Sequence, residues 1–215
     1  MAEEKFEGNR RNIFQFLFYV CMTIVNFFQI NWLNVHMKIP LNILITYLTC
    51  ISLFLNTIYY SFKTVKFFFI KKIEKTHPLD DAAFKFIFMV SFTVVTVFWS
   101  NQLLGTYYVV PKERVFPALL EFLTHGFNFI MNLIELFSNS RNGGDKLKIW
   151  HSIIFFGCYI SYLKIEYLRK GFAPYPVIGG ELFNKGFLIV YMSGNIIFVC
   201  SHYFYDILRK KEKSS

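Results

Sequence analysis

Residues 116–137 read FPALLEFLTHGFNFIMNLIELF, an apolar run interrupted by regularly spaced polar residues. The run is long enough to cross a lipid bilayer as a helix, which takes about 20 residues. Its polar residues are Glu121, His125, Asn128, Asn132 and Glu135, and their spacing places all five on one face of a helix. In lipid, such a face has to turn toward other helices. The stretch therefore predicts one member of a membrane helix bundle.

Five further apolar runs of similar length accompany this one. We predict spanning helices over 13–35, 41–62, 83–104, 116–137, 149–168 and 186–207. The runs lack the alternation of apolar and polar residues that barrel strands require. No internal repeat or low-complexity linker divides them. We therefore expect an all-α membrane protein, a six-transmembrane-helix bundle that forms a single domain over residues 1–215.

The composition agrees with this class. Hydrophobic residues make up 54% of the chain and charged residues 17%, whereas an average soluble domain is about 25% charged. So much apolar surface excludes a disordered chain. The formal net charge of +9 raises the alternative of nucleic-acid binding. Basic cytosolic loops explain the charge better, and no nucleic-acid motif is present, so we expect no nucleic-acid partner.

The distribution of lysine and arginine predicts the orientation. With the N-terminus in the cytosol, 16 of the 23 basic residues lie on the cytosolic side and 7 outside. Both termini are therefore expected in the cytosol. Lys211 and Lys213, near the C-terminus, resemble a dibasic retrieval signal, so we expect a multi-pass protein of the endoplasmic reticulum rather than of the plasma membrane.

The predicted helix over 41–62 also has a polar face. Its members are Asn42, Thr46, Thr49, Asn56 and Tyr60. The hydroxyl of a threonine in a spanning helix usually bonds back to a carbonyl one turn earlier and is then inert. A seam of interhelical hydrogen bonds explains both polar faces equally simply.

The depth of two of these residues favours a chemical role. Thr49 lies nine residues after Pro40, and His125 lies eight residues after Pro117. At 1.5 Å per residue, both are predicted about 12–14 Å below the outer boundary. A histidine can take the proton of a hydroxyl at neutral pH and so create a nucleophile. We thus expect Thr49 as nucleophile and His125 as base.

Other residues of the two faces are candidates for orienting the dyad or lining a pocket. Glu121 lies one turn before His125 and is the nearest candidate to orient the imidazole, while Glu135 suits either a site role or a structural charge near the inner interface. Asn128, Asn132, Thr46 and Asn56 complete the set of possible pocket residues.

Two further function classes stay open at this point. The helix over 116–137 also suits a small-solute or proton transporter, and a non-catalytic scaffold needs no chemistry at all. The chain lacks the paired half-repeats that favour a transporter.

No metal or cofactor site is expected. The four cysteines lie inside apolar runs without CxxC spacing, so we expect free thiols: Cys21, Cys50, Cys158 and Cys200. His202 and Asp206 are one turn apart and predict a solvated pair near the cytosolic end. Asp80 and Asp81 are expected to cap a helix.

Three stretches carry a resemblance to a known family: Tyr47-Leu48-Thr49, residues 94–100 (VVTVFWS) and residues 117–135. They resemble the androgen-induced and androgen-dependent TFPI-regulating proteins, six-helix membrane proteins described as threonine hydrolases. The resemblance implies a carboxylic ester hydrolase that cleaves fatty acid esters of hydroxy fatty acids and takes this lipid substrate from the bilayer. The nucleophilic threonine of the family falls on Thr49 and its catalytic histidine on His125. The chain departs from the family pattern at Thr46, where lysine is common.

Overall fold

The computed structural model describes residues 2–36, 41–44, 46–70, 78–103, 121–138, 147–171, 175 and 185–214. Nearly all of these residues are helical, and none of them is in a β-strand. The elements are α1 (Ala2–His36), α2 (Leu41–Leu44), α3 (Leu48–Ile70), α4 (Pro78–Leu103), the π-helix η1 (Leu123–Phe127), α6 (Asn128–Ser138), α7 (Ile149–Lys170) and α8 (Lys185–Ser214). The expectation of an all-α protein is confirmed for the described part of the chain.

The single helix expected over 41–62 is wrong, because the chain breaks into α2 and α3. Thr46 and Tyr47 form a turn between the two helices. The break puts Thr46 before α3 and Thr49 inside its first turn, so the two hydroxyls do not share one helical face. The side chain of Asn42 lies outside what the structure describes.

The other predicted ranges correspond to observed helices with shifted ends. The helix predicted over 116–137 is, in its described part, η1 followed by α6. The π-helix widens the backbone locally and changes the regular spacing of the side chains. Residues 104 and 116–120, and the landmarks Pro40 and Pro117, lie outside the described residues.

Local chemistry explains two of the ends. α4 begins at Pro78, a residue suited to the first helical position because it has no N–H to leave unpaired. Asp80 and Asp81 follow in the first turn, where the helix dipole favours negative charge. α7 ends at Gly171, which adopts φ 66° and donates its N–H to the carbonyl of Tyr167 at 2.8 Å.

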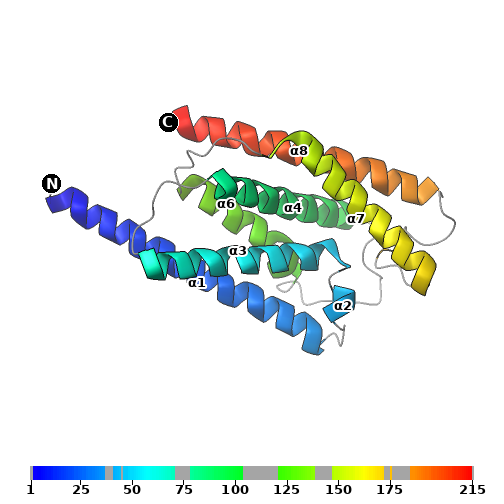
Figure 1. The fold of residues 1–215 in the computed structure, drawn as a ribbon, viewed down its shortest axis with the longest axis horizontal. Helices are drawn as coiled ribbons and strands as arrows, with labels where there is room; N and C mark the ends of the chain where they lie inside the picture. Colours follow the sequence, from blue (N-terminus) through cyan, green and yellow to red (C-terminus); the bar gives the residue numbers. More distant parts are fainter. Residues whose placement is uncertain are drawn as a thin grey trace.

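The centre of the bundle is formed by α3 and α4. α3 packs against α1, α4 and η1, while α4 also contacts α8 and α6, and α7 packs against α8. Figure 1 shows that the first residues of α1 and the last residues of α8 lie at the same end of the bundle, which we call the terminal end. α2 and the start of α3 lie at the opposite end.

Aromatic side chains fill the core on the terminal side. They come from α1, α3, α4 and α8, and each is at most 5% exposed: Tyr19, Tyr59, Tyr60, Phe84, Phe88 and Tyr205. Rings of this size bury a large apolar area per residue, so this cluster makes a large hydrophobic contact between these helices.

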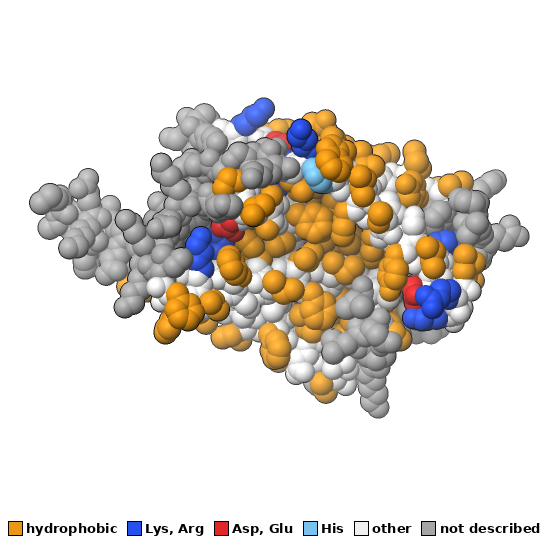
Figure 2. Space-filling model, in the orientation of Figure 1, with side chains coloured by type: hydrophobic (Ala, Val, Ile, Leu, Met, Phe, Trp, Pro, Cys, Tyr) orange, Lys and Arg blue, Asp and Glu red, His pale blue; other side chains and the backbone are white. Residues whose placement is uncertain are grey.

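The exterior is apolar as well. Many large hydrophobic side chains are exposed, among them Phe27, Phe69 and Leu103. Figure 2 shows hydrophobic side chains over the middle of one face, with the charged side chains of described residues toward its margins. Within the described residues, two helical segments are long and apolar enough to cross a membrane, Ile13–Val35 and Pro78–Ser100. This surface is typical of a membrane protein.

Candidate active site

Two tyrosine hydroxyls hold the break between α2 and α3. Tyr159 of α7 donates to the carbonyl oxygen of Thr46 at 2.8 Å, and the main-chain N–H of Leu48 donates to the hydroxyl of Tyr175 at 2.9 Å. The two hydroxyl oxygens are 3.5 Å apart. Main-chain groups freed at a helix break need partners when they are buried. The tyrosine pair supplies them, and it thereby fixes the first turn of α3, which carries Thr49.

The Tyr175 hydroxyl remains protonated in this place. The side chain as a whole is half-buried, but its hydroxyl is enclosed between Leu48 and Tyr159. Burial raises the pKa of Tyr175 to about 12. The phenol is therefore neutral at physiological pH and acts as a hydrogen-bonding group, not as a charge.

The hydroxyl of Thr49 differs from those of most described threonines. The following hydroxyls each donate to a carbonyl three or four residues earlier: Thr23, Thr46, Thr57, Thr64, Thr93 and Thr124. Thr49 is half-buried, and its hydroxyl makes no hydrogen bond within the described part of the chain. It is the second residue of α3, and Thr46, three positions earlier, lies in the turn before the helix. Thr49 is thus spared the back-bonding that makes other threonines inert.

His125 is held firmly at the middle of η1. Its Nδ1 lies 3.1 Å from the main-chain oxygen of Glu121 and 2.9 Å from the hydroxyl of Thr124. The ring stacks on Phe98 of α4, with 3.7 Å between ring centroids and planes 8° apart. A carbonyl oxygen only accepts, so the bond to Glu121 puts the proton on Nδ1 and leaves the lone pair on Nε2. No hydrogen bond of Nε2 is found among the described residues.

Glu121 therefore orients the imidazole through its main-chain carbonyl. The sequence predicted an orienting role for the Glu121 side chain, but the contact with His125 is made by the main-chain oxygen, and the described residues show no hydrogen bond or ion pair of the carboxylate. Sequence reasoning missed Thr124 and Phe98, because adjacency to a histidine and a ring on another helix give no periodic signal.

A buried ladder of hydrogen bonds connects α3, α4 and α6 beside this site. Ser91 of α4 lies 3.0 Å from the Ser52 hydroxyl and accepts from the amides of Asn56 (3.2 Å) and Asn132 (3.0 Å). Asn132 in turn accepts from the Tyr60 hydroxyl at 2.7 Å. All five residues are at most 2% exposed. Asn56 and Asn132, predicted as possible pocket residues, thus belong to an interhelical network.

The ladder sets the level of Thr49 relative to His125. Ser52 and Asn132 meet at Ser91, and the ring of His125 lies seven residues before Asn132. Thr49 is three residues before Ser52. Because Ser91 bonds both Ser52 and Asn56 of α3, the ladder places Thr49 and His125 within about one helical turn of each other along the bundle. The equal depth expected from the sequence stays a prediction.

The other predicted site residues lie elsewhere. Thr46 donates its hydroxyl to Ile43 and has its carbonyl bound by Tyr159, so it supports the break. Glu135 is buried near the terminal side, where it accepts from the Tyr19 hydroxyl at 3.3 Å. This contact with α1 agrees with the alternative in which Glu135 is a structural charge rather than a site residue. Asn128 lies between His125 and Asn132 on the same chain segment and is 4% exposed.

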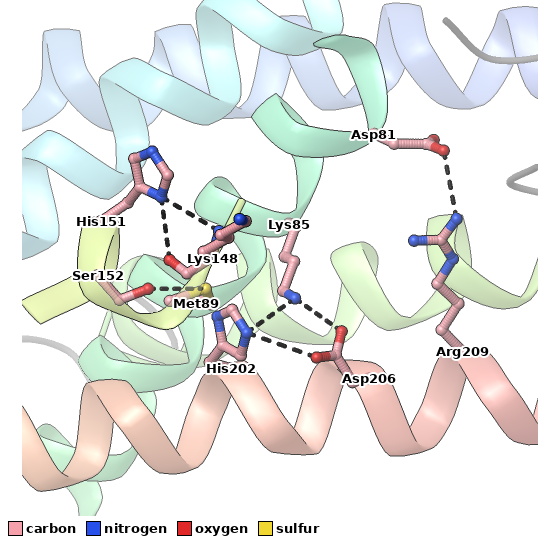
Figure 3. Close-up of polar contacts among 9 residues, drawn as sticks. All are labelled: Asp81, Lys85, Met89, Lys148, His151, Ser152, His202, Asp206 and Arg209. Carbon is pink, nitrogen blue, oxygen red and sulfur yellow. Dashed lines mark hydrogen bonds and ion pairs between the residues drawn. The ribbon is translucent and has the colours of Figure 1, made fainter. Parts of the chain in front are cut away.

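A separate polar cluster lies between α4 and α8 at the terminal end (Figure 3). The ammonium group of Lys85 lies 2.7 Å from Asp206 and 3.1 Å from Nε2 of His202. Arg209 approaches Asp81 at 3.5 Å. Lys85 is 1% and His202 5% exposed. The solvated pair expected for His202 and Asp206 is therefore wrong: a buried lysine from another helix completes it.

No metal site is found among the described residues. All four cysteines are described, and each is a free thiol, as the sequence predicts. Cys50 is buried, and the other three are exposed on the apolar exterior.

Comparison with known proteins identifies the family. The model of the family described as FAR-17a/AIG1-like protein matches residues 10–210. Because this match covers most of the chain, the chain belongs to that family. The resemblance read from the sequence motifs is confirmed. No curated protein and no solved structure matches the chain.

Proposed function

We propose that this chain, as a member of the FAR-17a/AIG1-like family, is a membrane-embedded ester hydrolase with Thr49 as nucleophile and His125 as general base. One observation carries the proposal. The Thr49 hydroxyl and the His125 Nε2 are both without hydrogen bonds in the described part of the chain. In contrast, His125 Nδ1 is bonded to the Glu121 carbonyl, and the carbonyl of Thr46, just before α3, is bonded to Tyr159. They belong to neighbouring elements, α3 and η1.

The proposed reaction proceeds in two halves. Thr49 Oγ attacks the ester carbonyl carbon while His125 Nε2 takes its proton. The tetrahedral intermediate then collapses, the ester C–O bond breaks, and His125 returns the proton to the leaving alcohol. In the second half, water attacks the acyl-threonine and gives its proton to His125. Release of the fatty acid returns that proton to Thr49.

The proposed substrate is a fatty acid ester of a hydroxy fatty acid, as the family resemblance implies. The apolar exterior supports a substrate that enters from lipid. Both products are carboxylic acids, one of which carries the freed hydroxyl. No metal or organic cofactor takes part in these steps.

We further propose six spanning helices with both termini in the cytosol. The positions of the two termini at one end of the bundle support this topology, and so do the basic residues there, which include Lys63, Lys85 and Arg209. A tag at Ser215 should be cleaved by protease added to sealed vesicles whose cytosolic face is outward, and accessibility of the tag from the lumenal or extracellular side would contradict this topology. We propose location in the endoplasmic reticulum on the basis of Lys211 and Lys213. Changing both to serine should release the protein to the cell surface.

The activity is tested on purified protein in detergent with a branched fatty acid ester. Thr49→Ala and His125→Ala should each lower kcat by several orders of magnitude, and the double variant should lose little more, because a dyad acts as a unit. A fluorophosphonate probe should label the wild type and not Thr49→Ala. Thr96→Ala is the matched control, since Thr96 is also half-buried with no hydroxyl hydrogen bond in the described part of the chain.

Near-normal turnover of Thr49→Ala would show that the nucleophile is wrong. Losses that multiply in the double variant would show that the two residues act separately. Solute flux by vesicles containing a protein that is not labelled would favour the transporter instead.

A further inference from the structure

Asn128 is a buried amide without hydrogen bonds. Its side chain is 4% exposed, and neither Nδ2 nor Oδ1 has a partner. Burying an amide in this way is unfavourable, so native proteins rarely retain it without a reason. A buried donor without a protein partner is available to a ligand when it lies beside a reactive group. Gln29 on α1 shares the burial and the missing partners, whereas Asn128 lies three residues after His125 on the same chain segment.

The neighbouring asparagines do not offer the same group. Asn132 has both amide atoms engaged, with Tyr60 and Ser91. The Nδ2 of Asn56 is bonded to main-chain and serine oxygens, and only its Oδ1 is vacant. A vacant Oδ1 is an acceptor and has no attraction for an anion. Asn128 is therefore the asparagine of the buried ladder region that has donors to spare.

Its place along the bundle is close to that of the proposed nucleophile. Asn128 lies four residues before Asn132, and Thr49 lies three residues before Ser52. Since Ser52 and Asn56 of α3 both bond Ser91 together with Asn132, Asn128 lies within about one helical turn of the level of Thr49. The amide of Asn132 is bonded to Ser91, whereas the amide of Asn128, one turn earlier on the same segment, has no partner.

Resting on the proposed hydrolase, we propose that Asn128 is the oxyanion donor of the reaction. When Thr49 Oγ bonds to the ester carbon, the carbonyl π electrons move to the oxygen. The Nδ2–H of Asn128 donates to that oxyanion, and the bond weakens again when the C–O bond of the leaving alcohol breaks. A donor fixed on a helix needs no reorganisation at this moment, which is what makes such groups effective.

The kinetic test compares Asn128→Leu with the wild type on the same ester. Loss of one oxyanion donor should lower kcat about 10²–10³-fold, with KM nearly unchanged, because the interaction exists only in the transition state. The rate of fluorophosphonate labelling should fall in parallel. Asn128→Asp should lose at least as much, since its carboxylate repels the oxyanion.

Stability separates this role from a structural one. Asn128→Leu removes no hydrogen bond, so its thermal midpoint should equal or exceed that of the wild type. Asn132→Leu breaks the ladder and should lower the midpoint. Gln29→Leu is the matched control, because Gln29 is another fully buried amide without partners, on α1. It should leave kcat unchanged.

Normal kcat in Asn128→Leu would overturn the oxyanion role while leaving the hydrolase in place, provided Thr49→Ala stays inactive. A wild type that lacks Thr49-dependent labelling and turnover would overturn both. If Asn128→Leu does not purify folded, Asn128→Ala removes the same donor, and full activity in that variant is equally contradictory.

Discussion

Replacing Tyr159 by Phe removes one atom that holds the break before α3. The Tyr159 side chain is 7% exposed, and its hydroxyl donates to the carbonyl of Thr46 at 2.8 Å. The phenyl ring keeps its contacts in the core formed by Phe156, Leu163 and Phe198. The substitution removes the hydrogen bond that holds the main chain at Thr46, three residues before Thr49.

The expected loss of stability is small. A hydrogen bond between helices in a membrane contributes about 0.6 kcal/mol on average, whereas a buried carbonyl left without a partner costs about 1–3 kcal/mol. The second effect dominates, because Thr46 is buried and is 6% exposed. We expect the free energy of unfolding to fall by about 1–2 kcal/mol, which lowers the thermal midpoint by roughly 2–8 °C.

The expected loss of activity is larger. A displacement of about 1 Å at a reacting group costs on the order of 10²-fold in rate. Tyr159→Phe should therefore lower kcat about 10–100-fold, with KM nearly unchanged, on the branched ester in detergent. Tyr162→Phe is the matched control, since it makes the same substitution on α7 at a side chain that is 43% exposed. A lowered midpoint with full kcat would refute the idea that the tyrosine pair positions Thr49.

Three further substitutions test other parts of the structure. Lys85→Met leaves Asp206 beside His202 without its cation and should lower the free energy of unfolding by about 3–5 kcal/mol. Denaturant titration measures this loss. The double variant with Asp206→Leu should recover most of it. Phe98→Ala removes the ring that stacks on His125 and should lower kcat about tenfold. Phe98→Leu retains apolar bulk and should lower kcat less. Equal kcat in the wild type and both variants would contradict the role of the stack. Ser91→Ala removes the oxygen shared by three hydrogen bonds and should lower the free energy of unfolding by about 1–3 kcal/mol with kcat within about threefold, so a large kcat effect would contradict its assignment to the supporting ladder.

The sequence by itself determined the helical segments and the residues on which chemistry could rest. Apolar runs of about 20 residues bury their backbone polar groups only as helices in lipid, so their positions follow from local composition. The spacing of Asn128 and Asn132 predicted a polar face directed into the bundle, and both are buried. Thr49 and His125 were singled out in the same way and from the family motifs, and their roles stay predictions.

Tertiary structure decided how these residues are held. The break before α3 depends on Tyr159 and Tyr175, whose hydroxyls bind the main chain more than 100 residues earlier, and no local pattern signals such partners. The choice of the Glu121 carbonyl over its carboxylate follows from the π-helix, a backbone feature that side-chain periodicity does not predict. Lys85 lies near the start of the helix predicted over 83–104, and its burial is possible because Asp206 and His202 on a distant helix contact its ammonium group. Local composition predicts which segments are apolar helices. Which polar atoms of those helices are bonded, and which have no partner, depends on contacts between residues far apart in the sequence.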